Sequence, residues 1–270
     1  MTIGPLLLIG GRENKEQHPE ILERFVELCR RHGGTPRIGV VTTASTEGQA
    51  LFAEYSRVFR RLGVQQVAGL NVDRRVEASA PALCQRMDEL TGIFFSGGDQ
   101  LRITSTLGGS RFHQILLQRH RKDGLAVGGT SAGASMMSHT MIVEGDAHES
   151  PTKNTVKMAA GMGLWNGAVI DQHFSQRGRI GRLLSAVAQN PDVLGIGLDE
   201  NTALEVRLEE TMLTVWGAST VTVVDGRAIQ ETNASESDDN QPLALTGVML
   251  HVLPKGYGMD LTTRTPRRIG

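Results

Sequence analysis

The residues best suited to chemistry surround one serine. The run Gly-Thr-Ser-Ala-Gly at 129–133 fits the pattern G-x-S-x-G and follows a short apolar run, 125–127. In a strand–turn–helix context this pattern places the serine hydroxyl on a sharp turn at the start of a helix, where it can act as a nucleophile. The same run is also compatible with a tight turn in which Ser131 only caps the helix. Ser131 is our candidate nucleophile.

A catalytic serine needs a base, and the base needs an acid that orients it. Among eight histidines, His173 follows the short apolar run 168–170, and His251 lies within the last predicted strand. The candidate acids Asp199 and Glu200 end the apolar run 193–198, and adjacent side chains there point to opposite sides. The orders Ser131–Asp199–His251 and Ser131–His173–Glu200 are both possible, and the spacing does not choose between them.

Backbone N–H groups close to the serine would stabilise the oxyanion that forms when it attacks a carbonyl. The N–H of Ala132, directly after the serine, is one candidate. A second is expected from the run Ser-Gly-Gly-Asp-Gln at 96–100, and within it from Gly98, because paired glycines let the backbone approach a substrate closely. The pair Gly10-Gly11 lacks G-x-G-x-x-G spacing, so we predict no dinucleotide site there.

Short apolar runs alternate with amphipathic stretches over the first two hundred residues. The predicted strands are 6–9, 37–42, 64–70, 92–95 and 125–127, and the predicted helices are 20–32, 50–62, 81–90 and 111–121. This alternation predicts an α/β fold with a mostly parallel sheet flanked by helices. The runs 202–206, 212–215 and 220–224 predict antiparallel strands added to one side of that sheet, and 248–253 predicts a last strand. The acidic stretch 231–241 is expected to be a solvated loop, and we predict one domain, 1–270.

The composition narrows the class of protein. The chain has 270 residues and a net charge of −1, which provides no strong field for nucleic acid or anionic lipid, and only 4 % of its residues are aromatic. Cys29 and Cys84 form no C-x-x-C pair, which argues against a disulfide framework or a zinc site. The sequence shows neither a signal peptide nor a membrane span. We expect a soluble cytoplasmic protein that uses no metal or cofactor and binds neither nucleic acid nor membrane.

Seven segments match a known family in their order and approximate spacing. They are LIGG at 8–11, FSGGDQLR at 95–102, GTSAGA at 129–134, DQHF at 171–174, RGR at 177–179, RLL at 182–184 and GLDENT at 197–202. With these segments the chain resembles the cyanophycinases of peptidase family S51, which also contains the aspartyl dipeptidases called peptidase E. Peptidase E shares the serine turn but not the arginines that follow DQHF. The resemblance implies a fold related to the class I glutamine amidotransferases.

The resemblance also implies a site and a substrate. It implies the triad order Ser131, His173, Glu200 and a homodimer. It further implies a pocket for cyanophycin, a poly-aspartate with arginine on each β-carboxyl that is cleaved to β-Asp-Arg dipeptides. The residues of that pocket are Gln100, Asp171, Gln172, Arg177, Arg179 and Arg182. Arginines grip carboxylates with a bidentate fork, and Asp171 would take the substrate guanidinium. Arg179 and Arg182 are three residues apart, so on a helix they would share one face.

Two segments, 143–155 and 231–241, depart from the family pattern and would reshape the rim of the pocket. Three other readings remain. A glutamine amidotransferase would have cysteine at the turn, and neither Cys29 nor Cys84 lies at a strand-to-helix turn. A peptidase E-like dipeptidase would use the same chemistry on shorter substrates. A non-catalytic binding module would not need the serine, histidine, acid and glycine loop in this order.

Overall fold

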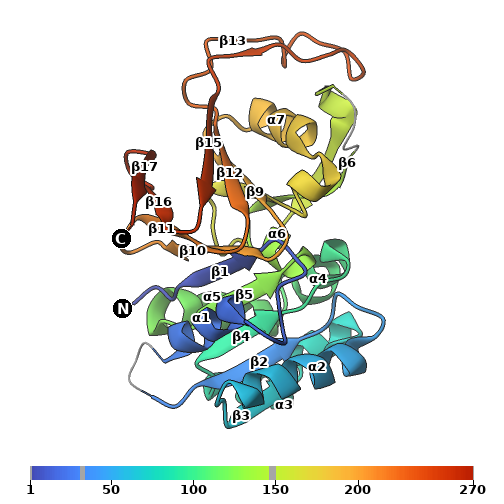
Figure 1. Cartoon of the computed structure of the whole chain (residues 1–270). Coiled ribbons are helices and arrows are strands. Elements are labelled where there is room, and N and C mark those ends of the chain that lie inside the picture. Colours follow the sequence, from blue (N-terminus) through green and yellow to red (C-terminus); the bar gives the residue numbers. More distant parts are fainter. Residues whose placement is uncertain (1, 31–33, 146–149, 270) are drawn as a thin grey trace.

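The computed structural model describes residues 2–30, 34–145 and 150–269. The end of the first predicted helix, 31–32, and part of the departing segment, 146–149, lie outside the described residues. The predicted fold class is confirmed. A large, mostly parallel central sheet is flanked by helices, and further strands follow towards the C-terminus, as Figure 1 shows.

The central sheet has nine strands. In spatial order they are β17 (Thr265–Arg268), β16 (Tyr257–Asp260), β11 (Met212–Gly217), β10 (Thr202–Arg207), β1 (Leu6–Ile9), β5 (Ala126–Thr130), β4 (Gly92–Phe95), β2 (Arg37–Val41) and β3 (Gln66–Gly69). The strands from β1 to β3 are parallel to one another, and the remaining four pair antiparallel. Parallel strands direct their carboxyl ends to one edge of a sheet, so the loops after β1, β4 and β5 meet there.

Alternation along the strands divides the core in two. Leu7 and Ile9 pack on one face with α1 (Glu20–Cys29) and α2 (Gly48–Arg61). Leu6 and Leu8 pack on the other face with residues of α3 (Pro81–Asp88), α4 (Gln100–Leu107) and α5 (Arg111–Asp123). All four side chains are fully buried, and such burial stabilises by roughly 1.5–3 kcal/mol per side chain. Strand β1 is therefore firmly held at the centre of the sheet, directly beside β5.

A second sheet of four strands departs from our expectation. Its order is β15 (Met249–Pro254), β12 (Thr220–Asp225), β9 (Leu194–Leu198), β8 (Ala168–Gln172). The prediction that 220–224 extends the central sheet is wrong, because β12 pairs with β9 and β15. Apolar periodicity identifies a strand but not its partner. One face of the second sheet packs on α7 (Ile180–Gln189), and Gly195 provides the room, since a Cβ there would lie 2.7 Å from Val187.

The two sheets share one hydrophobic core. Ile170 of β8 and Ile196 of β9 belong to the same buried cluster as Leu6 and Leu8 of β1. The single domain of residues 1–270 stays a prediction.

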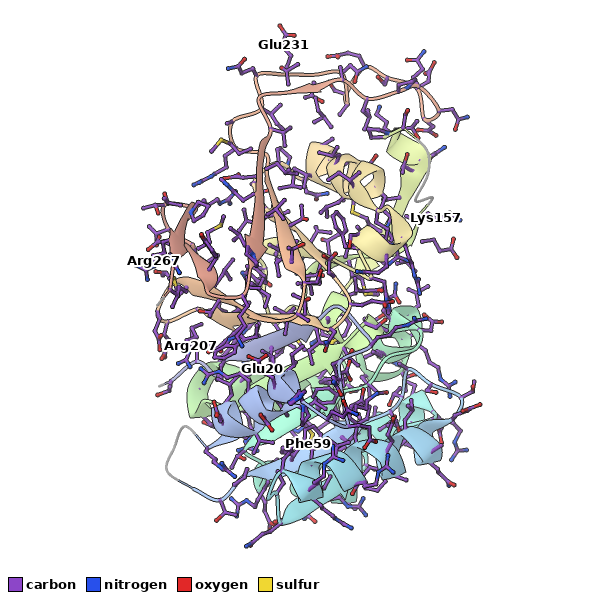
Figure 2. All side chains as sticks on the ribbon, viewed as in Figure 1. Glu20, Phe59, Lys157, Arg207, Glu231 and Arg267 are labelled. Carbon is purple, nitrogen blue, oxygen red and sulfur yellow. The ribbon has the colours of Figure 1, made fainter. Side chains whose placement is uncertain are left out.

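The stretch that we expected to be a solvated loop is an arm between β13 (Glu231–Thr232) and β14 (Leu245–Thr246), at the top of Figure 1. Glu231 points outward from it in Figure 2. Most of the arm is exposed, but it is anchored: the N–H of Leu243 donates to the carbonyl of Pro151 (2.7 Å), and the N–H of Asn154 donates to that of Asp239 (3.1 Å). The arm therefore packs on the other departing segment, next to the hairpin of β6 (Thr140–Gly145) and β7 (Val156–Ala160).

Four short helical turns complete the part of the chain that the structure describes. They are α6 (Ala132–Ser135), η1 (Arg75–Ser79), η2 (Lys153–Thr155) and η3 (Ser175–Arg177). Helix α6 directly follows β5, so the strand–turn–helix context predicted for the serine is present.

Candidate active site

Ser131 occupies a strained turn between β5 and α6. Its φ of 54° and ψ of −114° are rare for a residue with a side chain and cost of order 1–3 kcal/mol. Small neighbours make the turn possible, because a Cβ on Gly129 would lie 2.3 Å from the carbonyl oxygen of Gly133. The hydroxyl makes no capping hydrogen bond to α6. The turn therefore presents Oγ to the groups that face it instead of using it as a helix cap.

Ser131 Oγ, His173 and Glu200 form one line of hydrogen bonds. Oγ lies 3.0 Å from His173 Nε2, and His173 Nδ1 lies 2.7 Å from Glu200 Oε1. A carboxylate accepts, so Nδ1 carries the proton and Nε2 is left to accept from the serine hydroxyl. These side chains follow β5, β8 and β9, three strands from two different sheets. The arrangement is that of a nucleophile, a general base and an orienting acid.

Asp199 and His251, the acid and the base of the order Ser131–Asp199–His251, have other partners. Asp199 is 2 % exposed and accepts hydrogen bonds from the Ser175 N–H (3.0 Å) and from the hydroxyls of Ser219 and Thr220 (2.8 Å each). Burial raises the pKa of Asp199, but these donors outweigh it and hold the pKa below its ordinary value. His251 lies in β15, at the edge of the second sheet, where it pairs with Val223 of β12. The structure thus brings Glu200, not Asp199, to the histidine.

Burial sets the protonation state of His173. The residue is 8 % exposed, and loss of hydration lowers its pKa because water no longer stabilises the imidazolium. The hydrogen bond to Glu200 raises the pKa, the charge of Arg177 lowers it again, and the net pKa is below the ordinary value. The imidazole is therefore neutral near pH 7 and able to accept a proton.

Three consecutive carbonyl groups hold the three strand ends. The carbonyls of residues 9, 10 and 11 accept from the N–H groups of Ser131 (2.9 Å), His173 (2.9 Å) and Asn201 (2.8 Å) respectively. All three donors have φ near +50°, which is unfavourable for residues with side chains. The end of β1 and the two residues after it therefore fix the backbone of the segments that carry Ser131, His173 and Glu200.

Gly11 belongs to the site, which the sequence analysis missed. Its φ is +108°, and a Cβ there would lie 2.3 Å from His173 Cε1. We considered Gly10-Gly11 only as a phosphate loop. Glycine is needed at position 11 because the backbone there packs closely against the imidazole of His173 and leaves no room for a side chain. The signal available in the sequence was a glycine pair at the end of a central strand.

The glycine loop after β4 adjoins the serine. A Cβ on Gly97 would lie 3.4 Å from Ser131 Cβ, so the backbone at Gly97 passes directly beside the serine. Gly98 has a φ of +142° and packs on Ala44, where a Cβ would lie 2.3 Å from the carbonyl oxygen. Ala132 is fully buried at the start of α6. Both N–H groups expected to form the oxyanion hole thus lie in segments that border Ser131.

Asp171 pairs with two arginines of its own chain. The carboxylate is 1 % exposed, and it accepts from Arg182 Nε (2.6 Å) and Nη2 and from Arg179 Nη1 (3.2 Å). The guanidinium that we expected Asp171 to take from a substrate is supplied internally. Breaking such a buried pair is strongly destabilising, because one charge is left without a partner.

Of the remaining predicted pocket residues, Gln172 and Gln100 are buried and hydrogen-bonded, whereas Arg177 is at the surface. Gln172 Oε1 lies 3.4 Å from Ser131 Oγ and 3.3 Å from Arg179 Nη1. Gln100 donates to the carbonyls of Ile142 and Val143 (3.0 and 3.1 Å), so it fixes β6 beside the site. Arg177, in contrast, is exposed, and its charge acts on His173.

Arg179 keeps a buried donor without a partner. Burial lowers its pKa to about 10, and its Nε has no hydrogen-bond partner within the described ranges. The residue lines a cavity of about 290 Å³ together with Phe174, Ile180, Leu250 and Val252.

Two further residues support Glu200 and were not predicted. Arg12 Nε lies 3.3 Å from Glu200 Oε1, and Gln176 Oε1 accepts the Glu200 N–H at 3.0 Å. Within residues 2–30, 34–145 and 150–269, no three His, Cys, Asp or Glu side chains gather where they could hold a metal ion. No helix there is long and apolar enough to cross a bilayer.

An α/β fold with a serine, a histidine and a carboxylate in one line defines a serine-type hydrolase. The family model of peptidase family S51 matches residues 6–215, and the chain belongs to this family. It is 38 % identical to the cyanophycinase of Synechococcus elongatus, over 96 % of this chain and 80 % of the relative. It is 37 % identical to the cyanophycinase of Geminocystis herdmanii, over 97 % and 95 % of the two chains.

Solved structures agree on the fold. A peptidase from an acI-B1 actinobacterium superposes with a TM-score of 0.70 at 22 % identity, covering 96 % of this chain and 97 % of that one. A candidate peptidase E protein from Listeria monocytogenes superposes with a TM-score of 0.52 at 14 % identity, covering 80 % and 100 %. Its membership of peptidase family S51 and its similarity to the cyanophycinases make the chain a peptidase of the serine type.

Substitution of the two adjacent carboxylates separates their functions. Glu200→Gln should lower the rate at which a fluorophosphonate labels Ser131 by up to about 10⁴-fold, because a carboxamide no longer stabilises the protonated imidazole. Asp199→Asn should instead lower the melting temperature, because three donors lose their charged acceptor. Labelling rates by mass spectrometry and melting by circular dichroism measure the two effects. If Asp199→Asn slowed labelling and Glu200→Gln lowered only the melting temperature, the result would contradict the geometry.

The pH dependence of labelling follows from His173. Its lowered pKa keeps the imidazole neutral to a lower pH, so the labelling rate should fall on the acid side with a midpoint below 6.5. Arg177→Gln removes a charge that disfavours imidazolium, and the midpoint should therefore rise. The control is Arg268→Gln on β17, five strands from β5, which should leave the midpoint unchanged. A wild-type midpoint above 6.5, or no change in Arg177→Gln, would show that another group controls the rate.

Proposed function

We propose that the protein is a serine-type exopeptidase that hydrolyses cyanophycin to β-Asp-Arg dipeptides with Ser131, His173 and Glu200 as its triad. The observation that carries the proposal is the line of hydrogen bonds from Ser131 Oγ through the imidazole to Glu200. The relatives named cyanophycinase, matched over nearly the whole chain, support the substrate. The homodimer and the cytoplasmic location implied by the resemblance remain predictions.

In the proposed mechanism Ser131 Oγ attacks a backbone carbonyl of the polymer while His173 Nε2 takes its proton. Glu200 holds the imidazole through Nδ1 and stabilises the imidazolium that forms. The N–H groups of Ala132 and Gly98 would bind the oxyanion. The imidazolium then protonates the leaving amine, and a water molecule activated by the same imidazole hydrolyses the acyl-enzyme. No metal or cofactor takes part in these steps.

The substrate supplies charges that suit the pocket. Each unit of the polymer carries a guanidinium and the free carboxylate of its arginine, and the chain end adds another carboxylate. We propose that the exposed Arg177 meets a substrate carboxylate. Arg179 would contribute its unpartnered Nε from within the wall. Asp171 and Arg182 would act beneath the surface, because their paired charges hold Arg179 and Gln172 in place.

Two alternative functions can be tested with the same enzyme and polymer. A peptidase E-like dipeptidase would cleave short aspartyl peptides and leave the polymer intact. A non-catalytic module would bind the polymer without releasing dipeptides. The line of hydrogen bonds at Ser131 and the strained turn favour catalysis over binding alone, because strain of this kind is maintained at functional sites.

Release of β-Asp-Arg from purified cyanophycin tests the proposal. The wild-type enzyme should release dipeptides, detected by mass spectrometry, while the remaining polymer shortens gradually from its ends. Ser131→Ala should fold normally and lose several orders of magnitude in activity, up to about 10⁶-fold. Rapid fragmentation into long pieces would contradict exopeptidase action. Residual activity within about tenfold of wild type would exclude the serine mechanism.

Arginine-to-lysine substitutions test the different roles of the arginines. Arg177→Lys keeps the charge but loses the bidentate fork, so kcat/KM on the polymer should fall by the equivalent of roughly 1–3 kcal/mol with unchanged melting. Arg182→Lys should mainly lower the melting temperature, because it breaks the paired contact with the buried Asp171. Fluorophosphonate labelling of Ser131 should be nearly normal in Arg177→Lys. If that variant cleaves the polymer at wild-type efficiency, the substrate carboxylate is bound elsewhere.

A further inference from the structure

A buried carboxylate lies directly behind the serine turn. The side chain of Glu13 is 1 % exposed, although it follows a glycine pair in a loop. Its Oε2 accepts from the hydroxyl of Thr130 at 2.6 Å, and its Oε1 accepts from the hydroxyl of Tyr55 at 2.6 Å. Lys15 Nζ lies 3.8 Å from Oε1 of this carboxylate. A carboxylate at such depth is rare unless it is fully paired.

Thr130 connects this carboxylate to the chemistry. It is the last residue of β5 and directly precedes Ser131, whose backbone is in the left-handed region. A residue in that region relaxes to another conformation unless its neighbours hold it. The N–H of Ser131 is held by the carbonyl of Ile9 (2.9 Å), and the side chain of Thr130 is held by Glu13. The turn is thus fixed on both sides of the peptide that joins 130 to 131.

The same loop also reaches the other two triad members. Between β1 and Glu13, the carbonyl of Gly10 holds the His173 N–H and Arg12 lies 3.3 Å from Glu200. The side chain of Glu13 links this loop to β5 through Thr130 and to α2 through Tyr55. Removal of its carboxylate would take away the side-chain link between this loop and the residue that precedes Ser131.

We propose that Glu13 is a positioning residue that holds Ser131 in its attacking conformation by accepting the hydroxyl hydrogen bond of Thr130. The inference rests on the proposed function, because it assumes that Ser131 is the nucleophile. It assigns Glu13 no proton transfer. The charges that mainly shift the pKa of His173 are those of Arg177, Glu200 and Arg179. The effect of Glu13 is therefore on the place of Oγ and not on the basicity of the imidazole.

The test compares the rate of fluorophosphonate labelling at Ser131 with the melting temperature. Thr130→Val removes only the hydroxyl that Glu13 accepts and keeps a residue suited to a strand. It should slow labelling and lower kcat by between about tenfold and a hundredfold, as expected for a slightly misplaced nucleophile, with KM little changed. Glu13→Ala should slow labelling at least as much. Glu13→Gln keeps the shape and can hydrogen-bond both hydroxyls, so it should restore most of the rate.

Glu205 provides the matched control. It is also 1 % exposed and accepts from Arg24 (2.8 Å) and Trp216 (3.0 Å), on β10. Glu205→Ala should lower the melting temperature like Glu13→Ala but leave the labelling rate of folded protein unchanged. Equal labelling rates for Thr130→Val, Glu13→Gln and wild type would overturn the inference, even if Glu13→Ala does not fold. Absence of labelling in the wild-type protein would instead mean that the proposed function has failed.

Discussion

Three hydrogen bonds to consecutive carbonyl groups, those of residues 9, 10 and 11, are the constraint on which the site depends. Their donors are Ser131, His173 and Asn201, and each donor has an unfavourable backbone conformation that costs of order 1–3 kcal/mol. A backbone hydrogen bond returns about 1 kcal/mol, so packing must supply the rest. Strand β1 can provide that support because its side chains are fully buried on both faces of the central sheet. A strand that is buried on both faces of the sheet thus supports three residues with unfavourable backbone conformations.

The charged side chains near the site form a buried group and a surface group. Asp171 and Arg182 pair in the interior, and Arg179 shares that carboxylate while it reaches the wall of a small cavity. Arg177 lies at the surface and lowers the pKa of His173 together with burial. The interior pair fixes the wall, and in the proposed function the surface cation is left to bind a substrate anion. This division explains how neighbouring arginines in one short stretch can have different functions.

Much of the fold and part of the site follow from local sequence patterns. Strand β1 and helix α3 begin where periodicity predicts, and the small residues around Ser131 predict its turn, because both features depend on near neighbours. The second sheet does not follow, since periodicity does not identify pairing partners. Local patterns also cannot predict three features of the site. These are the contact of His173 with Glu200 and not Asp199, the pairing of Asp171 with arginines, and the packing of Gly11 on His173. Each of these depends on residues that are distant in sequence and adjacent only after folding.

The most direct test of the account is detection of the acyl-enzyme during turnover. Cyanophycin and enzyme are mixed, quenched in acid within a single turnover and digested, and the peptide that contains Ser131 is weighed by mass spectrometry. The account predicts a transient mass gain on that peptide, equal to the acyl part of the cleaved chain and therefore to a whole number of β-Asp-Arg units, that disappears when water hydrolyses the ester. Full turnover without any adduct on the Ser131 peptide, under conditions that trap acyl-enzymes of other serine peptidases, would contradict it.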